Sequence, residues 1–244
     1  MKQLEVLKQY FGYTSFRKGQ DEIIEHILSG QDALGIMPTG AGKSLCFQVP
    51  ALILEGITIV VSPLISLMKD QVEALIQAGV PAAYINSSLT PAQSRLALDY
   101  AKQGKYKIIY VAPERLLTDE FKSFSNGVNI SMISVDESHC VSQWGQDFRP
   151  SYLKIAEYIE MFSKRPIVCA FTATATKSVK QDIIKLLKLN KPLVVSTSFD
   201  RPNLYFEVQK PSDKFSAVIN FLDNNPNQTG IIYCSTRKNV EEVC

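Results

Sequence analysis

The chain has 244 residues, of which 45% are hydrophobic and 20% charged, and its formal net charge is +2. This composition is ordinary for a globular protein and argues against a disordered or fibrous chain. So small a net charge does not by itself indicate a nucleic-acid partner. No apolar stretch approaches the roughly 18 residues that span a bilayer, so we expect a cytoplasmic protein without a membrane partner.

The cysteines are scattered along the chain without C-x-x-C spacing. In a chain without a signal-peptide core, reduced and mostly buried thiols are the default. We therefore expect neither a disulfide framework nor a zinc site within these residues. The five positions are Cys46, Cys140, Cys169, Cys234 and Cys244.

Two amphipathic helices are predicted first, over residues 2–11 and from about residue 20 to Gly30, because apolar residues recur there at helical spacing. The turn between them holds Tyr13, Arg17 and Gln20. Tyr13 is placed to stack on a base, and the Gln20 amide offers the donor and acceptor that match an adenine edge. Taken alone, these side chains are more often packing or solvated residues.

A phosphate-binding loop, residues 37–44, is the strongest signal in the chain. An apolar strand over 33–37 precedes it and helical character resumes at Lys43, so its glycines fall between strand and helix. There, backbone N–H groups cradle phosphates, while the lysine reaches the β/γ-phosphates and the hydroxyl ligates Mg²⁺. Met37 departs from the strict motif, which has glycine, and a Gly-rich turn before a surface helix is the alternative. The expected nucleotide-binding residues are Thr39, Gly40, Ala41, Gly42, Lys43, Ser44 and Leu45.

Strands and helices alternate after this loop. Because the strands are apolar on both faces, the pattern predicts an α/β fold with a parallel sheet between helices and ligands at the strand carboxyl ends. Strands are expected at 57–62, 82–86, 107–111, 131–135 and 166–171, and helices at 64–77, after Thr90-Pro91 and at 177–189.

Two carboxylates, Asp136 and Glu137, end the strand over 131–135. In phosphoryl-transfer sites of this architecture, the first completes a Mg²⁺ shell and the second orients or deprotonates the attacking water. Acidic pairs at strand ends are also common as plain turn residues. Their combination with Lys43 and Ser44 upstream favours the catalytic interpretation.

An aromatic-rich segment with the only tryptophan follows His139. Aromatic residues interleaved with polar residues and an arginine suit stacking on bases and contact with phosphates. A loop that closes the core with its tryptophan is the alternative. Hydroxyls also end the strand over 166–171, at Thr172 and Thr174, where they can bond a phosphate, a carboxylate or a helix terminus.

The chain is expected to divide near residue 198 into a first domain of 1–197, a turn-rich linker over 198–206 and a short second unit of 207–244. That unit is predicted to contain strands near 204–208 and 230–234, a helix over 212–223 and a helix beginning at Arg237. About two strands cannot form a complete sheet, so the chain is expected to be a fragment.

In chain order these segments resemble the motifs of the RecQ family of DNA helicases, whose motor consists of two RecA-like lobes. The pairing of an acidic box with a tryptophan segment is the most specific resemblance. Ser138 stands where the family usually has alanine, and Gln146 where it usually has histidine. The matching segments are F-G-Y-T-S-F-R-K-G-Q, M-P-T-G-A-G-K-S-L-C-F-Q-V-P-A, V-S-P-L-I-S-L-M-K-D-Q-V, Y-V-A-P-E-R-L, D-E-S-H-C with S-Q-W-G-Q-D-F-R-P, A-F-T-A-T-A-T and I-I-Y-C-S-T-R-K-N-V.

The resemblance implies ATP and Mg²⁺ as cofactors and assigns roles to the residues above. Lys43 and Ser44 would hold the phosphates and Mg²⁺, Asp136 the Mg²⁺ and Glu137 the water. Tyr13, Arg17 and Gln20 would hold adenine. The residues that would sense DNA and couple it to hydrolysis are His139, Gln143, Trp144, Phe148, Arg149, Thr172 and Thr174.

The resemblance implies a monomeric, ATP-dependent DNA helicase in recombination and repair, translocating 3′ to 5′ on single-stranded and tailed duplex DNA. The family's arginine finger would lie beyond Cys244. Because such a finger contributes about 10³ to 10⁵ in rate, the chain alone is expected to bind nucleotide and hydrolyse it poorly. Two alternatives remain: a DNA-stimulated ATPase or remodeller that separates no strands, and an ATP-independent DNA-binding module.

Overall fold

The computed structural model describes residues 2–145, 147–197 and 204–243. The chain divides into two compact units, Met1–Phe199 and Asp200–Cys244, which we describe separately. Of the expected linker over 198–206, residues 198–203 lie outside the described residues. Within the described ranges, no helix is both long and apolar enough to cross a bilayer.

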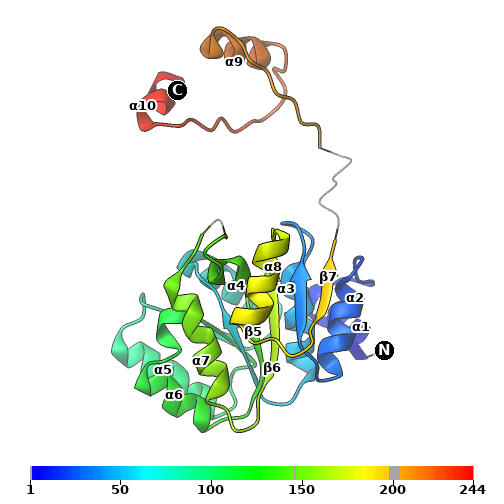
Figure 1. The fold of residues 1–244 in the computed structure, drawn as a ribbon, viewed down its shortest axis with the longest axis vertical. Helices are drawn as coiled ribbons and strands as arrows, with labels where there is room; N and C mark the ends of the chain where they lie inside the picture. Colours follow the sequence, from blue (N-terminus) through cyan, green and yellow to red (C-terminus); the bar gives the residue numbers. More distant parts are fainter. Residues whose placement is uncertain (1, 146, 198–203, 244) are drawn as a thin grey trace. The chain divides into compact units, whose positions relative to one another are not determined.

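The first unit is built on a seven-stranded parallel sheet with strand order β3-β4-β2-β5-β6-β1-β7. Figure 1 shows this unit with strands β5, β6 and β7 labelled among its helices. The predicted α/β fold is confirmed. Strands β1, β2 and β4 are buried along their whole length, which explains their continuous apolar sequences. The strands are β1 (Ala33–Ile36), β2 (Ile57–Val61), β3 (Ala82–Ile85), β4 (Ile108–Val111), β5 (Ile130–Val135), β6 (Ile167–Thr172) and β7 (Leu193–Ser196).

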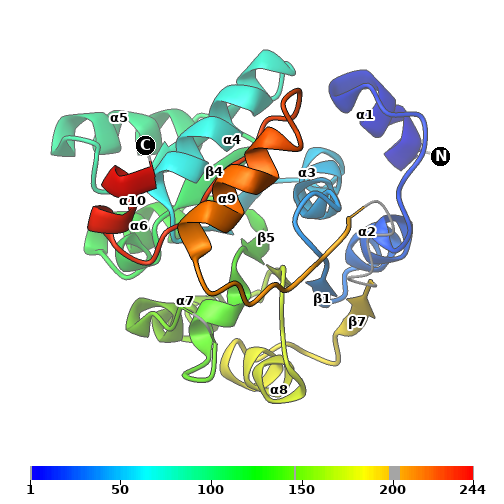
Figure 2. The same cartoon turned by 90° about the horizontal axis from the view of Figure 1, so that it is seen from above.

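Helices cover both faces of the sheet (Figure 2). Helices α2, α3 and α4 supply the apolar side chains of one core, and α5 to α8 supply those of the other. Helix α1 adds Leu7 to a small cluster with α2 and α3. The helices are α1 (Lys2–Phe11), α2 (Gln20–Leu28), α3 (Lys43–Ile53), α4 (Ile65–Gln77), α5 (Pro91–Lys102), α6 (Asp119–Asn126), α7 (Lys154–Glu160) and α8 (Lys177–Leu186), with short 3₁₀ turns η1 (Pro113–Arg115), η2 (Ser138–Val141) and η3 (Pro150–Leu153).

The topology brings distant sequence segments together at one edge of the sheet. Strand β6 lies between β5 and β1, and all three run parallel, with Ile36 in register with Thr172. Carboxyl ends of parallel strands meet at the same edge. The segments after β1, β5 and β6 therefore lie side by side: the phosphate loop, the acidic pair and the threonine turn.

Several expected elements differ from those observed. The short edge strand β7 and the helices α6 and α7 were not predicted, and α8 ends at Leu186 rather than at residue 189. Within the described part of the second unit, the strands expected at 204–208 and 230–234 are not formed, so these predictions were wrong. That unit contains α9 (Lys214–Asp223) and α10 (Arg237–Val243), neither with a buried residue. A segment with a strand-like sequence needs a neighbouring strand to pair with and an apolar surface to pack against. Without them, its backbone N–H and C=O groups bond to water.

Candidate functional site

A cavity of about 550 Å³ opens at the carboxyl edge of the sheet. The phosphate loop, the acidic pair and the turn between α1 and α2 all line it. Tyr13 in the turn and Glu137 in the acidic pair are 124 positions apart in the sequence. Helix α4 closes one side with Leu67 and Gln71. The predicted site residues that line it are Tyr13, Arg17, Gln20, Thr39, Gly40, Gly42, Lys43, Ser44, Leu45, Asp136 and Glu137, whereas Ala41 does not line it.

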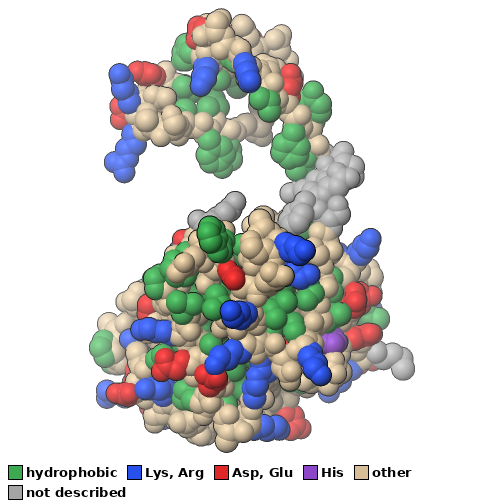
Figure 3. All heavy atoms as spheres, in the orientation of Figure 1, with side chains coloured by type: hydrophobic (Ala, Val, Ile, Leu, Met, Phe, Trp, Pro, Cys, Tyr) green, Lys and Arg blue, Asp and Glu red, His purple; other side chains and the backbone are tan. Residues whose placement is uncertain are grey.

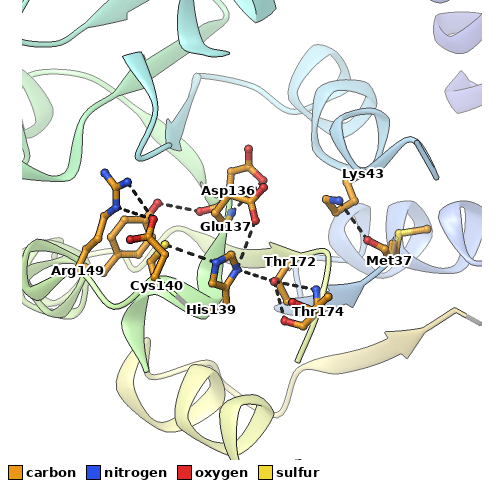
Figure 4. Close-up of polar contacts among 11 residues, drawn as sticks. Met37, Lys43, Asp136, Glu137, His139, Cys140, Arg149, Thr172 and Thr174 are labelled. Atoms are coloured by element: carbon orange, nitrogen blue, oxygen red, sulfur yellow. Dashed lines mark hydrogen bonds and ion pairs between the residues drawn. The ribbon is translucent and has the colours of Figure 1, made fainter. Parts of the chain in front are cut away.

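The phosphate loop adopts the backbone that its glycines allow. Gly40 and Gly42 both have φ of +81°, in the left-handed region, and Gly42 is the N-cap of α3. The Lys43 ammonium donates to the Met37 carbonyl at 3.1 Å, so it lies folded over the loop (Figure 4). A loop of this shape at a helix N-terminus presents N–H groups to an anion.

The Gln20 side chain binds the backbone of this loop, a role that was not predicted from the sequence. Its side chain is buried, and Nε2 donates to the carbonyls of Ala41 at 3.1 Å and Gly42 at 3.0 Å. Its Oε1 accepts from the Arg17 N–H at 2.8 Å, and the Arg17 guanidinium donates to the Gly40 carbonyl. Both Gln20 amide hydrogens are used inside the protein. The adenine contact of this amide stays a prediction, while its support of the loop is direct.

Asp136 and Glu137 stand at the end of β5, facing the cavity (Figure 4). The Asp136 Oδ1 accepts from the Glu137 N–H at 2.9 Å. Burial, reinforced by the neighbouring Glu137 charge, raises the pKa of Asp136 to about 6. Glu137 has φ of +45°, which is uncommon for a residue other than glycine.

The donor set fits a magnesium–nucleotide complex. The Ser44 hydroxyl and the Asp136 carboxylate both line the cavity, and oxygen donors are those that Mg²⁺ prefers. A buried carboxylate whose pKa is raised beside a second carboxylate is stabilised in its charged form by a cation. No cluster of three or more His, Cys, Asp or Glu in the described residues is placed to hold a metal ion. Oxygens of a bound nucleotide are ligands of the same type.

His139 links the acidic pair to the threonine turn. Its Nδ1 lies 2.9 Å from Thr172 Oγ1 and 3.3 Å from Glu137 Oε2 (Figure 4). Thr172 Oγ1 in turn donates to the Thr174 carbonyl at 3.0 Å. Because the one Thr172 proton is used there and a carboxylate only accepts, Nδ1 carries the imidazole proton. Burial lowers the pKa of His139, which favours this neutral imidazole.

The backbone of Thr172 also contacts the phosphate loop. The Met37 N–H donates to the Thr172 carbonyl at 3.0 Å, at the point where the phosphate loop begins. Thr172 is fully buried. Thr172 therefore contacts both sides of the site, through Oγ1 to His139, which lies next to Glu137, and through its backbone carbonyl to the start of the phosphate loop.

The segment from Ser142 to Arg149, here called the Trp loop, follows η2, and none of its described residues lines the cavity. Its Trp144 is 78% exposed, which excludes the alternative that this residue closes the core. Phe148 is half-buried and Gln143 is exposed, while the predicted departure Gln146 lies outside the described residues.

Arg149 fixes the far end of the Trp loop. Its guanidinium donates to Asp147 Oδ2 at 2.9 Å and to the Pro63 carbonyl at 3.0 Å, and its N–H donates to the Cys140 carbonyl at 2.9 Å. Pro63 precedes α4, which walls the cavity. The Trp loop thus touches both the segment after β2 and the histidine turn.

Comparisons with known proteins agree with this geometry. A family model described as DEAD/DEAH box helicase matches residues 17–182. The ATP-dependent DNA helicase RecQ of Bacillus subtilis is 46% identical over 98% of this chain and 40% of its own length, and that of Pasteurella multocida is 44% identical over 98% and 38%. The chain thus spans about two fifths of these relatives.

Solved structures share the fold at low sequence identity. The helicase MrfA is 17% identical, with a TM-score of 0.74 over 100% of this chain and 40% of that one. A hypothetical ATP-dependent RNA helicase from Sulfolobus tokodaii is 18% identical, with a TM-score of 0.61 over 80% of this chain and 56% of that one. Similarity at this level of identity supports the fold, and the chemistry is argued from the residues of the site.

Proposed function

Because the chain belongs to the DEAD/DEAH box helicase family, we propose that it is the nucleotide-binding lobe of an ATP-dependent DNA helicase motor. The resemblance to RecQ helicases that the motifs indicated is confirmed. The observation that carries the proposal is the single cavity in which Lys43, Ser44 and the Asp136–Glu137 pair meet.

In the proposed mechanism, residues of this lobe position ATP and the attacking water. The loop N–H groups and the Lys43 ammonium bind phosphate oxygens, and Tyr13 stacks on the base at the mouth of the cavity. Ser44 and Asp136 would hold Mg²⁺, and the ion would supply positive charge against the phosphates. Glu137 orients the water and accepts its proton, and the neutral His139 holds the Glu137 side chain through Nδ1–H.

The DNA response is proposed to start at the Trp loop. Lysines, arginines and acidic residues are interspersed over the face of the first unit that Figure 3 shows, and the formal net charge is only +2. Electrostatic attraction alone is therefore a weak basis for DNA binding by this chain. Stacking of bases on the exposed Trp144, with Phe148 nearby, supplies a contact that does not depend on charge.

The finer parts of the proposal follow the RecQ resemblance. Residues 1–197 act as the first RecA-like lobe and 207–244 begin the second, joined by 198–206. A longer protein supplies an arginine finger and translocates 3′ to 5′ along single-stranded or tailed duplex DNA, as a monomer in recombination and repair. Hydrolysis by the chain alone is correspondingly slow.

The test compares ATP hydrolysis by the 244-residue chain with hydrolysis by the protein extended through a complete second lobe, each with and without single-stranded DNA. We expect both to bind ATP and only the longer protein to respond to DNA. The longer protein should also displace a strand from a duplex with a 3′ tail, and Lys43→Ala is the inactive control. DNA-stimulated hydrolysis without displacement would support the remodeller alternative, and activity untouched by Lys43→Ala would support the binding module.

A further inference from the structure

The near end of the Trp loop is shaped by one buried hydroxyl. Ser142 is fully buried, and its Oγ donates to Asp182 Oδ2 at 2.6 Å while accepting from the Trp144 N–H at 3.2 Å. The Ser142 carbonyl also accepts from the Gly145 N–H at 2.9 Å. The turn that carries Trp144 is therefore built around Ser142.

Asp182 determines how that hydroxyl is used. A serine hydroxyl has one proton, and a carboxylate can only accept, so the proton points to Asp182 and a lone pair remains for the Trp144 N–H. A hydroxyl that donates to an ionised carboxylate forms a short, strong hydrogen bond, and 2.6 Å falls in that range. Without the carboxylate, the hydroxyl is free to rotate and the N–H loses a fixed partner.

The far end of the Trp loop does not depend on this contact. Arg149 is tied to the Cys140 and Pro63 carbonyls and to Asp147, all outside α8. Loss of Asp182 should therefore loosen the half of the loop that carries Trp144 and leave the other half in place.

Helix α8 also connects this contact to the coupling residues. The helix begins at Lys177, capped by the Thr176 side chain, which accepts from the Val179 N–H. Thr176 follows directly on the turn of Thr172 and Thr174. A single helix thus joins the threonine turn at its start to the Trp loop at its second turn.

We infer that Asp182 is a positioning residue of the Trp loop, which acts through Ser142 to hold the Trp144 indole out where a DNA base can stack on it. Asp182 lies outside every motif that the sequence offered, and it does not line the nucleotide cavity. The importance of this position for DNA sensing rests on the proposed function, whereas the positioning itself does not.

Trp144 gives a direct readout, because it is the only tryptophan in the chain. In Asp182→Ala we expect the steady-state anisotropy of Trp144 fluorescence to fall and its quenching by acrylamide to rise. Ser142→Ala should do the same, and the double variant should add nothing to either single change. Asp182→Asn keeps an acceptor oxygen and should largely retain the wild-type anisotropy. Gln181→Ala, an exposed neighbour on the same helix, is the matched control.

In the protein with a complete second lobe, Asp182→Ala should lower the stimulation of ATP hydrolysis by single-stranded DNA about tenfold or more, the size expected from one lost hydrogen bond to a charged group. Hydrolysis without DNA should stay unchanged. Unchanged Trp144 anisotropy in Asp182→Ala, or additive effects in the double variant, would overturn the inference. Lower anisotropy with full DNA stimulation would support the positioning role and count against the Trp loop as DNA sensor, so the two proposals fail separately.

Discussion

The phosphate loop and the Trp loop lie at the same edge of one sheet, but the protein holds them in different ways. The carbonyls of Gly40, Ala41 and Gly42 are bound along the phosphate loop by Arg17 and Gln20. The Trp loop is fixed at its two ends, by Ser142 and by Arg149, and its Trp144 side chain is 78% exposed.

The difference matches two kinds of ligand. A nucleotide phosphate is small and needs N–H groups at fixed positions, and the bonded carbonyls of Gly40, Ala41 and Gly42 hold the loop backbone in place. A base of a nucleic-acid strand offers a flat face, for which one exposed indole on a held turn is enough. Between the loops lie His139 and Thr172, joined by a hydrogen bond: the phosphate loop contacts Thr172 through the Met37 N–H, and the Trp loop contacts His139 through the Ser142 N–H.

The largest effect is expected at the residue that serves chemistry alone. Glu137→Gln removes the proposed base and keeps the size of the side chain. ATP hydrolysis in the longer protein should fall by about 10² to 10⁴, the usual contribution of a general base. ATP affinity, measured by calorimetry, should change little because Glu137 contacts no phosphate in the proposal. A retained hydrolysis rate would contradict the role assigned to Glu137.

Lys43→Ala should act on nucleotide binding and leave the Trp loop unaffected. Loss of a charge-assisted hydrogen bond to phosphate should weaken ATP affinity by about 10- to 100-fold. The anisotropy of Trp144 should remain that of the wild-type chain. If Lys43→Ala lowered both ATP affinity and Trp144 anisotropy, the conformation of the Trp loop would depend on the phosphate loop.

A matched pair of glycines separates the loops more finely. A Cβ on Gly42 would lie 2.4 Å from Gln20 Nε2, at a φ of +81°, and a Cβ on Gly145 would lie 2.3 Å from the His139 carbonyl. Gly42→Ala should lower ATP affinity by about tenfold, since a left-handed alanine and a displaced Gln20 both disturb the loop. Gly145→Ala should instead lower Trp144 anisotropy. If Gly42→Ala lowered Trp144 anisotropy and Gly145→Ala lowered ATP affinity, the assignment of Gly42 to nucleotide binding and of Gly145 to the Trp loop would be wrong.

The residues that line the cavity were predictable where they are neighbours in sequence. The strand, the glycines and Lys43 follow one another, and Asp136 with Glu137 end a strand, so each group could be recognised from neighbouring residues. The contacts of Gln20 with the loop and of Ser142 with Asp182 join residues 21 to 40 positions apart. They depend on how helices pack at the sheet edge, which spacing along the chain does not encode.

Prediction of the strands from the sequence was limited in the same way, by contacts between distant segments. Continuously apolar strands such as Ile57–Val61 were predicted because burial on both faces leaves an uninterrupted apolar sequence. The four-residue edge strand Leu193–Ser196 leaves a weaker one, and its pairing with β1 decides its structure. Residues 230–234 carry a strand pattern as strong as many in the sheet. They form no strand because pairing, and not pattern alone, satisfies a strand backbone.

The smallest effect is expected at Ser138, which lies between the acidic pair and the Trp loop. Its side chain is fully buried, and its Oγ has no hydrogen-bond partner among the described residues. A buried hydroxyl without a partner costs more than it contributes, so Ser138→Ala, the residue usual in RecQ helicases, should raise the free energy of unfolding by about 1 kcal/mol. Urea denaturation measures this change, with Ser123→Ala at an exposed position of α6 as control. Neither ATP affinity nor Trp144 anisotropy should respond, because Ser138 bonds to neither loop; a loss of stability would instead reveal a partner for this hydroxyl.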